Sequence, residues 1–299
     1  MIHCDRVIVE REGQMVIDRV SLSIAHGESL ALIGRSGAGK SSLLAALATA
    51  MPIRGGDITV GGRSARREPA AVRPLVGYVP PLLVAPPGVR AEEFLGLFAA
   101  AAGLAGAACR TSVERGLAAA GLSGRGGERI DRLPEPTWKL LLVARALLHS
   151  PDVLVLDDPF AGLDPVGRRW LERLLDDMSL AGRTVVAAID DARVPDCFTS
   201  LAVLLEGRLH AHGPVDPDTI APGRAWRHRI LCHGMAEKAA AVASRLSAGV
   251  SPVDAHAFDC LLPTAGTAVA QLVSRLVAAG IGVTGVGIHP PWTEQLVAD

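Results

Sequence analysis

Short apolar runs alternate with longer amphipathic segments through the first two-thirds of the chain. The runs Ser29–Ile33, Val153–Leu156 and Thr184–Ile189 have the length and composition of buried strands. Helices are predicted between such runs, for example at Val166–Met178. Strands that alternate with helices favour an α/β fold on a mostly parallel sheet, in which ligands bind at the carboxyl ends of the strands.

Two regions differ from this alternation. The first 80 residues contain further strand-like segments at Arg6–Glu10 and Val20–Ile24, each followed by a turn. Residues 91–149 instead predict three helices, Ala91–Ala102, Val113–Ala120 and Trp138–His149, separated by loops rich in Gly and Arg. A strand-rich beginning and a helical middle are therefore expected.

The pattern changes again at Pro214–Gly223, which has the composition of a linker. Beyond the linker, the predicted elements follow the order strand, helix, strand, strand, helix, strand. That order fits a small α+β module of the ferredoxin-like type. We therefore expect two domains, residues 1–215 and 224–299, which a chain of 299 residues can accommodate.

Composition narrows the class of protein. The 30 basic and 31 acidic residues nearly cancel, so the net charge gives no reason to expect a nucleic-acid partner. The five cysteines form no C-x-x-C pair, which favours reduced thiols in the cytoplasm over disulfides or zinc. Three long uncharged stretches are interrupted by Pro and Gly, and the start lacks a signal-peptide pattern, so no transmembrane helix is expected.

The strongest chemical signal follows Ser29–Ile33 and is a complete G-x-x-x-x-G-K-[ST] phosphate-binding loop. Its glycines let backbone N–H groups turn inward around phosphates, and the next helix adds the positive end of its dipole. Lys40, one of only three lysines, would reach the β- and γ-phosphates, and the Ser41 hydroxyl would hold Mg²⁺. ATP with Mg²⁺ is therefore the expected ligand. The predicted phosphate-binding residues are Gly34, Arg35, Ser36, Gly37, Ala38, Gly39, Lys40, Ser41 and Ser42.

A second element of this site is the acidic pair Asp157-Asp158 at the end of an apolar strand. Alone, such a pair can be a strand-end turn, but coupled to a phosphate loop it indicates a Walker B element. Asp157 would reach the Mg²⁺ that Ser41 also holds, and Asp158 would orient the attacking water.

The phosphate loop and the continuous segment Ala144–Pro165 together resemble the ATP-binding cassette (ABC) family of transporter ATPases. The segment includes counterparts of the family's Walker B strand and D-loop, Ala161–Asp164. The resemblance covers about residues 1–215, and the remainder resembles the C-terminal appendage of the drug-export branch. It implies a P-loop (RecA-like) ABC domain with an antiparallel β subdomain and a helical subdomain inserted at about residues 82–150.

The resemblance also implies partners and a location. A second ABC ATPase chain would complete a dimer, with a heterodimer favoured over a homodimer. A separately encoded transmembrane permease would hold the cytoplasmic dimer on the inner face of the cell membrane.

Four single positions depart from the family's pattern. The adenine-stacking aromatic position falls at Arg11, whose guanidinium can also stack on a base. The Q-loop glutamine position holds Pro81, which offers no side-chain ligand. Asp158 replaces the catalytic glutamate and is one methylene shorter, so it can position water poorly. Asp190 replaces the switch histidine and presents an acidic acceptor where the γ-phosphate needs a donor.

The signature segment is the fifth departure, because Leu133–Thr137 stands where the family has L-S-G-G-Q. In the family this loop clasps the γ-phosphate bound to the partner chain through a serine, backbone N–H groups and a helix N-terminus. Pro134 and Pro136 remove two N–H donors, although Pro136 also suits a helix start. Glu135 would add a charge near the phosphate, and two unit charges about 4 Å apart repel by about 4 kcal/mol at an effective dielectric of about 20.

These departures predict a chain that binds ATP·Mg and hydrolyses it slowly or not at all. Each ATP in an ABC dimer lies between one chain's Walker motifs and the other chain's signature. Both kinds of defect lie in this one chain, so with any partner one site lacks its switch residues and the other lacks its clasp. Two alternatives stay open: a regulatory or scaffold protein with structural ATP, and an ordinary active ATPase whose aspartates substitute adequately.

Overall fold

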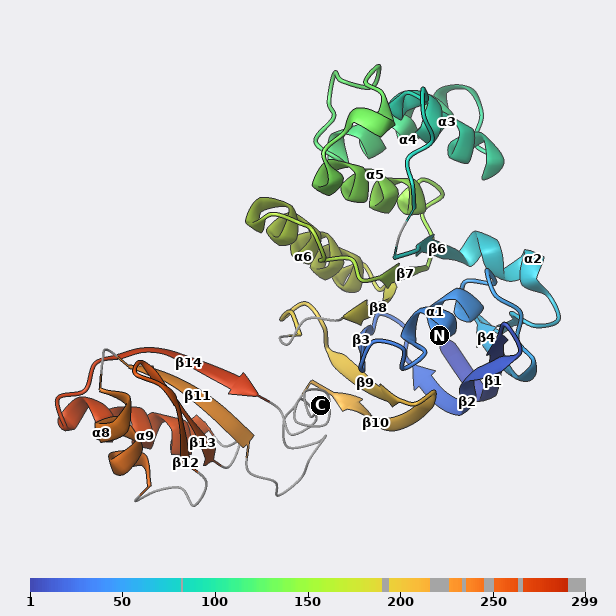
Figure 1. Cartoon of the computed structure of the whole chain (residues 1–299). Coiled ribbons are helices and arrows are strands. Elements are labelled where there is room, and N and C mark those ends of the chain that lie inside the picture. Colours follow the sequence, from blue (N-terminus) through green and yellow to red (C-terminus); the bar gives the residue numbers. More distant parts are fainter. Residues whose placement is uncertain are drawn as a thin grey trace. The chain divides into compact units, whose positions relative to one another are not determined.

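The chain forms two compact units, Met1–His212 and Gly213–Asp299 (Figure 1). The computed structural model describes residues 1–81, 83–189, 194–215, 226–232, 235–244, 250–262 and 266–289. Within these ranges, no helix is both long and apolar enough to cross a membrane.

A six-stranded sheet forms the centre of the first unit, in the order β10-β9-β3-β8-β7-β6. β3 pairs in parallel with β8 and β9, and β7 pairs in parallel with β6 and β8. Every residue of β3, β7 and β8 is buried, as expected for parallel strands covered on both faces, so the predicted parallel sheet is confirmed. The strands are β3 (Ser29–Ile33), β6 (Val76–Val79), β7 (Val153–Asp157), β8 (Thr184–Ile189), β9 (Ser200–Leu205) and β10 (Arg208–Pro214).

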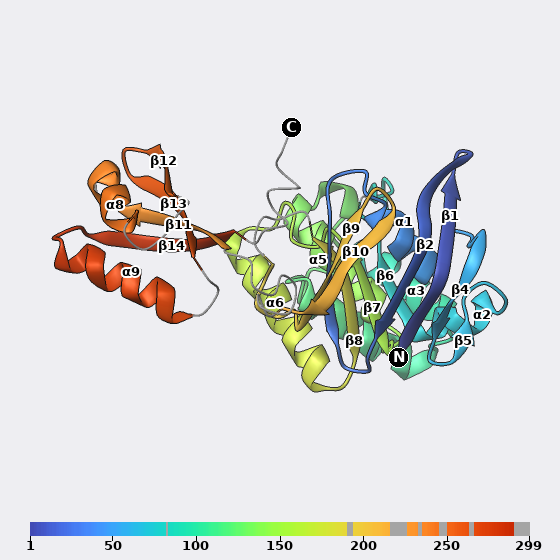
Figure 2. The same ribbon diagram turned by 90° about the horizontal axis from the view of Figure 1, so that it is seen from below.

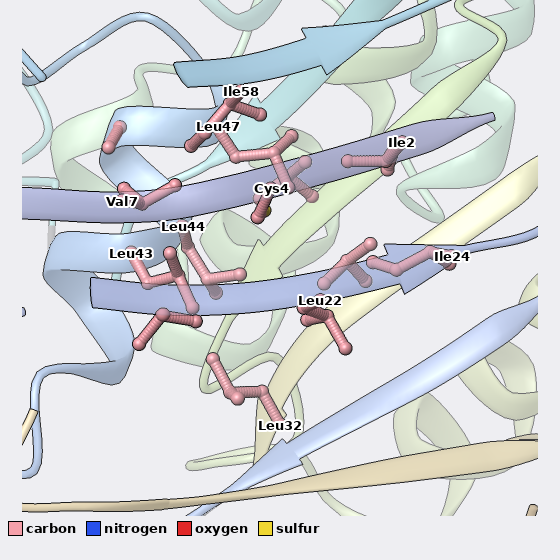
Figure 3. Packing of buried hydrophobic residues seen from close by; sticks show 14 of the residues in the cluster. Ile2, Cys4, Val7, Leu22, Ile24, Leu32, Leu43, Leu44, Leu47 and Ile58 are labelled. Atoms are coloured by element: carbon pink, nitrogen blue, oxygen red, sulfur yellow. The ribbon is translucent and has the colours of Figure 1, made fainter. Parts of the chain in front are cut away.

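A second, antiparallel sheet lies at the start of the chain, in the order β2-β1-β4-β5. Its strands are β1 (Ile2–Arg11), β2 (Gln14–Ile24), β4 (Gly55–Val60) and β5 (Arg63–Ser64). Helix α1 (Lys40–Leu47) packs between the two sheets, and its Leu43, Leu44 and Leu47 share one buried cluster with Ile58 of β4 and Leu32 of β3 (Figure 3). This apolar packing fixes the helix that follows the phosphate loop.

The helices after α1 in the first unit match predicted helices with shifted ends, except α2, which was not predicted. Their bounds are α2 (Pro69–Val72), α3 (Ala91–Ala101), α4 (Gly106–Ala119), α5 (Glu135–Leu147) and α6 (Pro165–Leu180), with short 3₁₀ turns at Arg73–Leu75 and Ile130–Arg132. α3 and α5 meet through Phe94 and Trp138, whose ring centroids are 5.1 Å apart. α5 begins three residues before the predicted Trp138, because Pro134 forms its N-cap and Pro136 fits the first turn.

The second unit contains β11 (Trp226–Cys232), α8 (Ala236–Ala243), β12 (Val250–Asp254), β13 (Ala257–Leu262), α9 (Gly266–Ala278) and β14 (Val283–His289). Its sheet has the order β12-β13-β11-β14, and all pairs are antiparallel. Both helices pack on the sheet (Figure 2). Phe258, Ile230 and Leu272 are fully buried in the core of this unit. The predicted β-α-β-β-α-β order of a ferredoxin-like module is confirmed.

Candidate functional site

The phosphate loop connects β3 to α1 and depends on glycine at specific positions. Gly37 and Gly39 have φ angles of 80° and 98°, in the left-handed region that only glycine adopts without strain. A Cβ at Gly34 would lie 2.3 Å from the carbonyl oxygen of Leu204, and one at Gly39 would lie 2.5 Å from that of Val16. The glycines therefore allow the loop to pack against β9 and β2 while its backbone curves.

Lys40 begins α1 and bends back over the loop. Its Nζ donates hydrogen bonds to the carbonyl oxygens of Gly34 at 2.6 Å and Arg35 at 3.1 Å, and the residue is 7% exposed. Ser41 is exposed beside it, whereas Ser42 is buried against the core. The loop thus combines curved backbone, a held ammonium and an accessible hydroxyl, a donor set that suits the phosphates of a nucleotide and its cation.

Asp157 ends β7 at the same edge of the sheet as the phosphate loop. Leu32 of β3 and Asp157 both pair with Ala188 of β8, so the two residues are level, two strand spacings of about 5 Å apart. Asp157 is 3% exposed. Carboxylate and hydroxyl oxygens are the ligands that Mg²⁺ prefers, so Asp157 and Ser41 fit the cation of a bound ATP.

Asp158 and Lys139 form a contact that the sequence analysis did not predict. Asp158 has a φ angle of 48°, which is uncommon for a residue other than glycine. Lys139 of α5 donates from Nζ to the carbonyl oxygen of Asp158 at 2.8 Å and to that of Ala161 at 2.6 Å. Burial lowers the pKa of Lys139, and the carboxylates of Asp158, Glu135 and Asp157 oppose this shift. The signal in the sequence that could have indicated this contact was Lys139 itself, one of three lysines, which stands on a predicted helix four residues after Glu135.

Comparison with known proteins identifies the family. The profile of the ABC transporter family matches residues 17–161. Nod factor export ATP-binding protein I of Paraburkholderia xenovorans (strain LB400) is 31% identical over 213 residues, which cover 71% of this chain and 70% of that protein. The chain belongs to the ABC transporter family. It is therefore an ATP-binding subunit of the ABC transporter type.

Other relatives of this ABC subunit extend the comparison. Linearmycin resistance ATP-binding protein LnrL of Bacillus subtilis (strain 168) is 24% identical over 286 residues, covering 94% of this chain and 92% of that protein. A dimeric ATP-binding cassette in a post-hydrolysis state, bound to ADP and Pi, has the same fold with a TM-score of 0.66 at 21% identity, covering 72% of this chain and 99% of that one. An ATP-binding subunit of an ABC transporter gives 0.65 at 26% identity, covering 72% and 90%.

The signature segment of this ABC subunit forms the first turn of α5. Pro134 is the N-cap residue and makes no side-chain capping bond, Glu135 is the first helical residue and Pro136 the second. Glu135 is exposed, and its Oε1 lies 3.0 Å from where a Cβ of Gly162 would be. The carboxylate of Glu135 therefore lies against the D-loop of its own chain.

The Q-loop position, Pro81, lies just beyond the end of β6 and is anchored on both sides by α5. Arg145 donates to the carbonyl oxygen of Tyr78 and places its guanidinium 5.0 Å from the ring centroid of Phe98. Trp138 donates from Nε1 to the carbonyl oxygen of Leu83 at 2.7 Å. Burial raises the pKa of Tyr78 to about 12, Asp157 adds to this shift, and Arg145 opposes it. Helix α5 therefore contacts the backbone before and after Pro81.

Two predicted positions remain, Arg11 and Asp190. Arg11 ends β1, pairs with Gln14 across the hairpin and lies 3.9 Å from Glu12 with 63% of its side chain exposed. On the adjoining strand β2, the carbonyl oxygen of Val16 lies close to Gly39 of the phosphate loop. Asp190, the predicted substitute for the switch histidine, lies outside the described residues.

Proposed function

We propose that this chain binds ATP·Mg and hydrolyses it slowly or not at all, as one subunit of an ABC transporter. A second ABC ATPase chain would complete the dimer, and a separately encoded permease would hold both at the inner face of the membrane. Residues 1–215 would form the ATP-binding domain and residues 224–299 an accessory module. The names of the relatives refer to export and to resistance, which favours the drug-export branch and an exporter.

The observation that carries the weak-hydrolysis proposal is the N-terminus of α5. A helix start binds an anion through free N–H groups and the positive end of its dipole. Pro134 and Pro136 have no N–H, and the carboxylate of Glu135 already occupies the first turn. This helix start offers little to the γ-phosphate of a partner chain, which hydrolysis would need to stabilise.

The chain's own residues divide into those that bind and those that react. Gly34–Ser42 would surround the phosphates, and Ser41 and Asp157 would hold Mg²⁺, which neutralises the developing charge when it is bound. Asp158 would place the attacking water, but its side chain is one methylene shorter than glutamate. A misplacement on the order of 1 Å can cost about 100-fold in rate. The chain is therefore expected to bind ATP·Mg but to hydrolyse it slowly.

The test compares nucleotide binding with steady-state turnover of the purified full chain. We expect saturable ATP·Mg binding that Lys40→Ala abolishes, together with a kcat well below about 1 s⁻¹. A kcat of about 1 s⁻¹ or more that depends on Lys40 would instead identify an ordinary active ATPase.

Purification of the chain with its natural partners tests the transport assignment. We expect a membrane protein with several transmembrane helices and a second ABC ATPase to accompany the chain. Recovery of soluble partners alone, with ATP retained, would support a regulatory or scaffold protein in which ATP is structural.

A further inference from the structure

Two charged residues of α5 face the segment that follows Asp157. Glu135 and Lys139 are one helical turn apart, so they lie on the same side of the helix. Lys139 contacts the carbonyl oxygens of Asp158 and Ala161, and Glu135 lies against Gly162. In the family, the start of this helix faces a partner chain. In this structure, Lys139 and Glu135 at the start of α5 contact the D-loop of the same chain.

The segment held by Lys139 has an unusual backbone. Asp158 adopts a left-handed conformation, with a φ angle of 48°, and its N–H donates to the carbonyl oxygen of Ala188 at 3.1 Å. Such a conformation costs about 1 kcal/mol or more in a residue with a side chain, and it persists where its surroundings hold it. Two charge-assisted hydrogen bonds from one ammonium to the carbonyls of Asp158 and Ala161 supply that hold at both ends of the turn.

Lys139 also brings charge to this position. The carboxylates of Asp157, Asp158 and Glu135 all act on its ammonium, which is partly buried. A cation close to Asp157 and Asp158 offsets part of their negative charge. ATP would bring several further negative charges to the same place. The repulsion between ATP and the acidic pair is weakened as a result.

We propose that Lys139 is a positioning residue of its own chain's nucleotide site, which fixes the turn from Asp158 to Ala161 and offsets the charge of the acidic pair. The charge part rests on the proposed function, because it requires ATP beside Asp157. The positioning part does not, because the two hydrogen bonds belong to the protein alone.

The positioning part is tested by hydrogen exchange on the full chain without nucleotide. In Lys139→Met, amides of the peptide covering residues 158–164 are expected to exchange at least fivefold faster, with Lys139→Arg close to the parent chain. Lys238→Met is the matched control, because it removes an exposed lysine of α8 in the second unit by the same substitution. Unchanged exchange in Lys139→Met, or an equal change in Lys238→Met, overturns this part.

The charge part is tested by binding of a fluorescent ATP analogue with Mg²⁺ and with EDTA. Lys139→Met and Lys139→Gln are both expected to weaken binding in EDTA by about fifteenfold more than binding with Mg²⁺. Removing Mg²⁺ leaves ATP with two more negative charges, and each has roughly a fourfold effect about 10 Å away at an effective dielectric of about 40. Lys139→Arg and Lys238→Met should keep the parent ratio. If Lys139 only supports the fold, its substitution weakens ATP binding equally with Mg²⁺ and with EDTA, and that result overturns the charge part.

Separate outcomes distinguish the failure of this proposal from that of the proposed function. A parent chain that binds no ATP contradicts the proposed function, while the exchange experiment still decides the positioning part. If Lys139→Met unfolds, Lys139→Ala serves for the exchange measurement, since it also removes the N–H donor. An unchanged turn in a folded Lys139→Ala, accompanied by an unchanged EDTA ratio in Lys139→Gln, refutes both parts.

Discussion

Gly34 and Gly96 show two opposite consequences of glycine at the scale of a single residue. A Cβ at Gly34 would lie 2.3 Å from the carbonyl oxygen of Leu204, whereas one at Gly96 of α3 would have no atom within 4 Å. We expect Gly34→Ala to destabilise the chain by about 2–4 kcal/mol, because the backbone must shift. Gly96→Ala should stabilise it by about 0.5–1 kcal/mol through helix propensity. Urea unfolding measures both, and equal effects would contradict the packing described for Gly34.

Asp158 gives a second prediction at this scale. We expect Asp158→Glu to raise kcat by no more than about tenfold, because the longer side chain reaches the water better but the start of α5 still lacks two N–H groups. Asp158→Asn should remove the residual turnover while leaving ATP·Mg binding within about twofold. Steady-state phosphate release and nucleotide titration measure these two outcomes. A 100-fold rise of kcat in Asp158→Glu would mean that the signature segment does not limit the rate of hydrolysis.

The residues of the site differed in how far the sequence could predict them. Fixed spacing predicted Lys40 and placed Asp157 at a strand end, because each motif position has its own physical requirement. Lys139 was not predicted, since its contacts run from α5 to carbonyl oxygens of residues 158 and 161 and no spacing rule encodes them. The contact of Glu135 with Gly162 within the same chain was missed for the same reason.

At the scale of elements, some buried strands were predicted exactly and another was missed. Ser29–Ile33 and Thr184–Ile189 were predicted with their exact ends, because each is an apolar run fully buried in the parallel sheet. β9, which pairs with β3 in that sheet, was not predicted although Leu201–Leu205 is apolar. Only the three-dimensional pairing shows that the chain returns to the centre of the sheet after β8.

The junction of β2 and β10 carries a prediction about pH. Asp18 of β2 accepts hydrogen bonds from Arg19 at 3.0 Å and from Arg208 of β10 at 2.9 and 2.6 Å. These bonds, that of Arg19 first, hold the pKa of Asp18 below its usual value of 3.8. A depressed pKa in the folded state gives stability that is present above about pH 4 and is lost as the pH falls through the folded-state pKa.

The variant that tests this junction is Asp18→Asn. We expect it to lower the urea midpoint at pH 7 and to make the midpoint less sensitive to acid below about pH 4, because no carboxylate remains to be protonated. Asp5→Asn is the control, since the ion pair of Asp5 with Arg6 is exposed on both sides, at 58% and 75%, and contributes little. Equal midpoints for the two variants across the pH range would count against the junction.

At the scale of the whole molecule, all residues predicted to bind the nucleotide belong to the unit Met1–His212. ATP·Mg is therefore expected to stabilise that unit, by about 2.7 kcal/mol at a free concentration 100 times the Kd, and to leave the second unit unchanged. Hydrogen exchange of the full chain measures both at once. Peptides covering Ser29–Ile33 should gain protection with ATP·Mg, whereas peptides covering Val250–Asp254 should not. Lys40→Ala should abolish the gain, and equal protection of both units would show that nucleotide binding is transmitted to the C-terminal module.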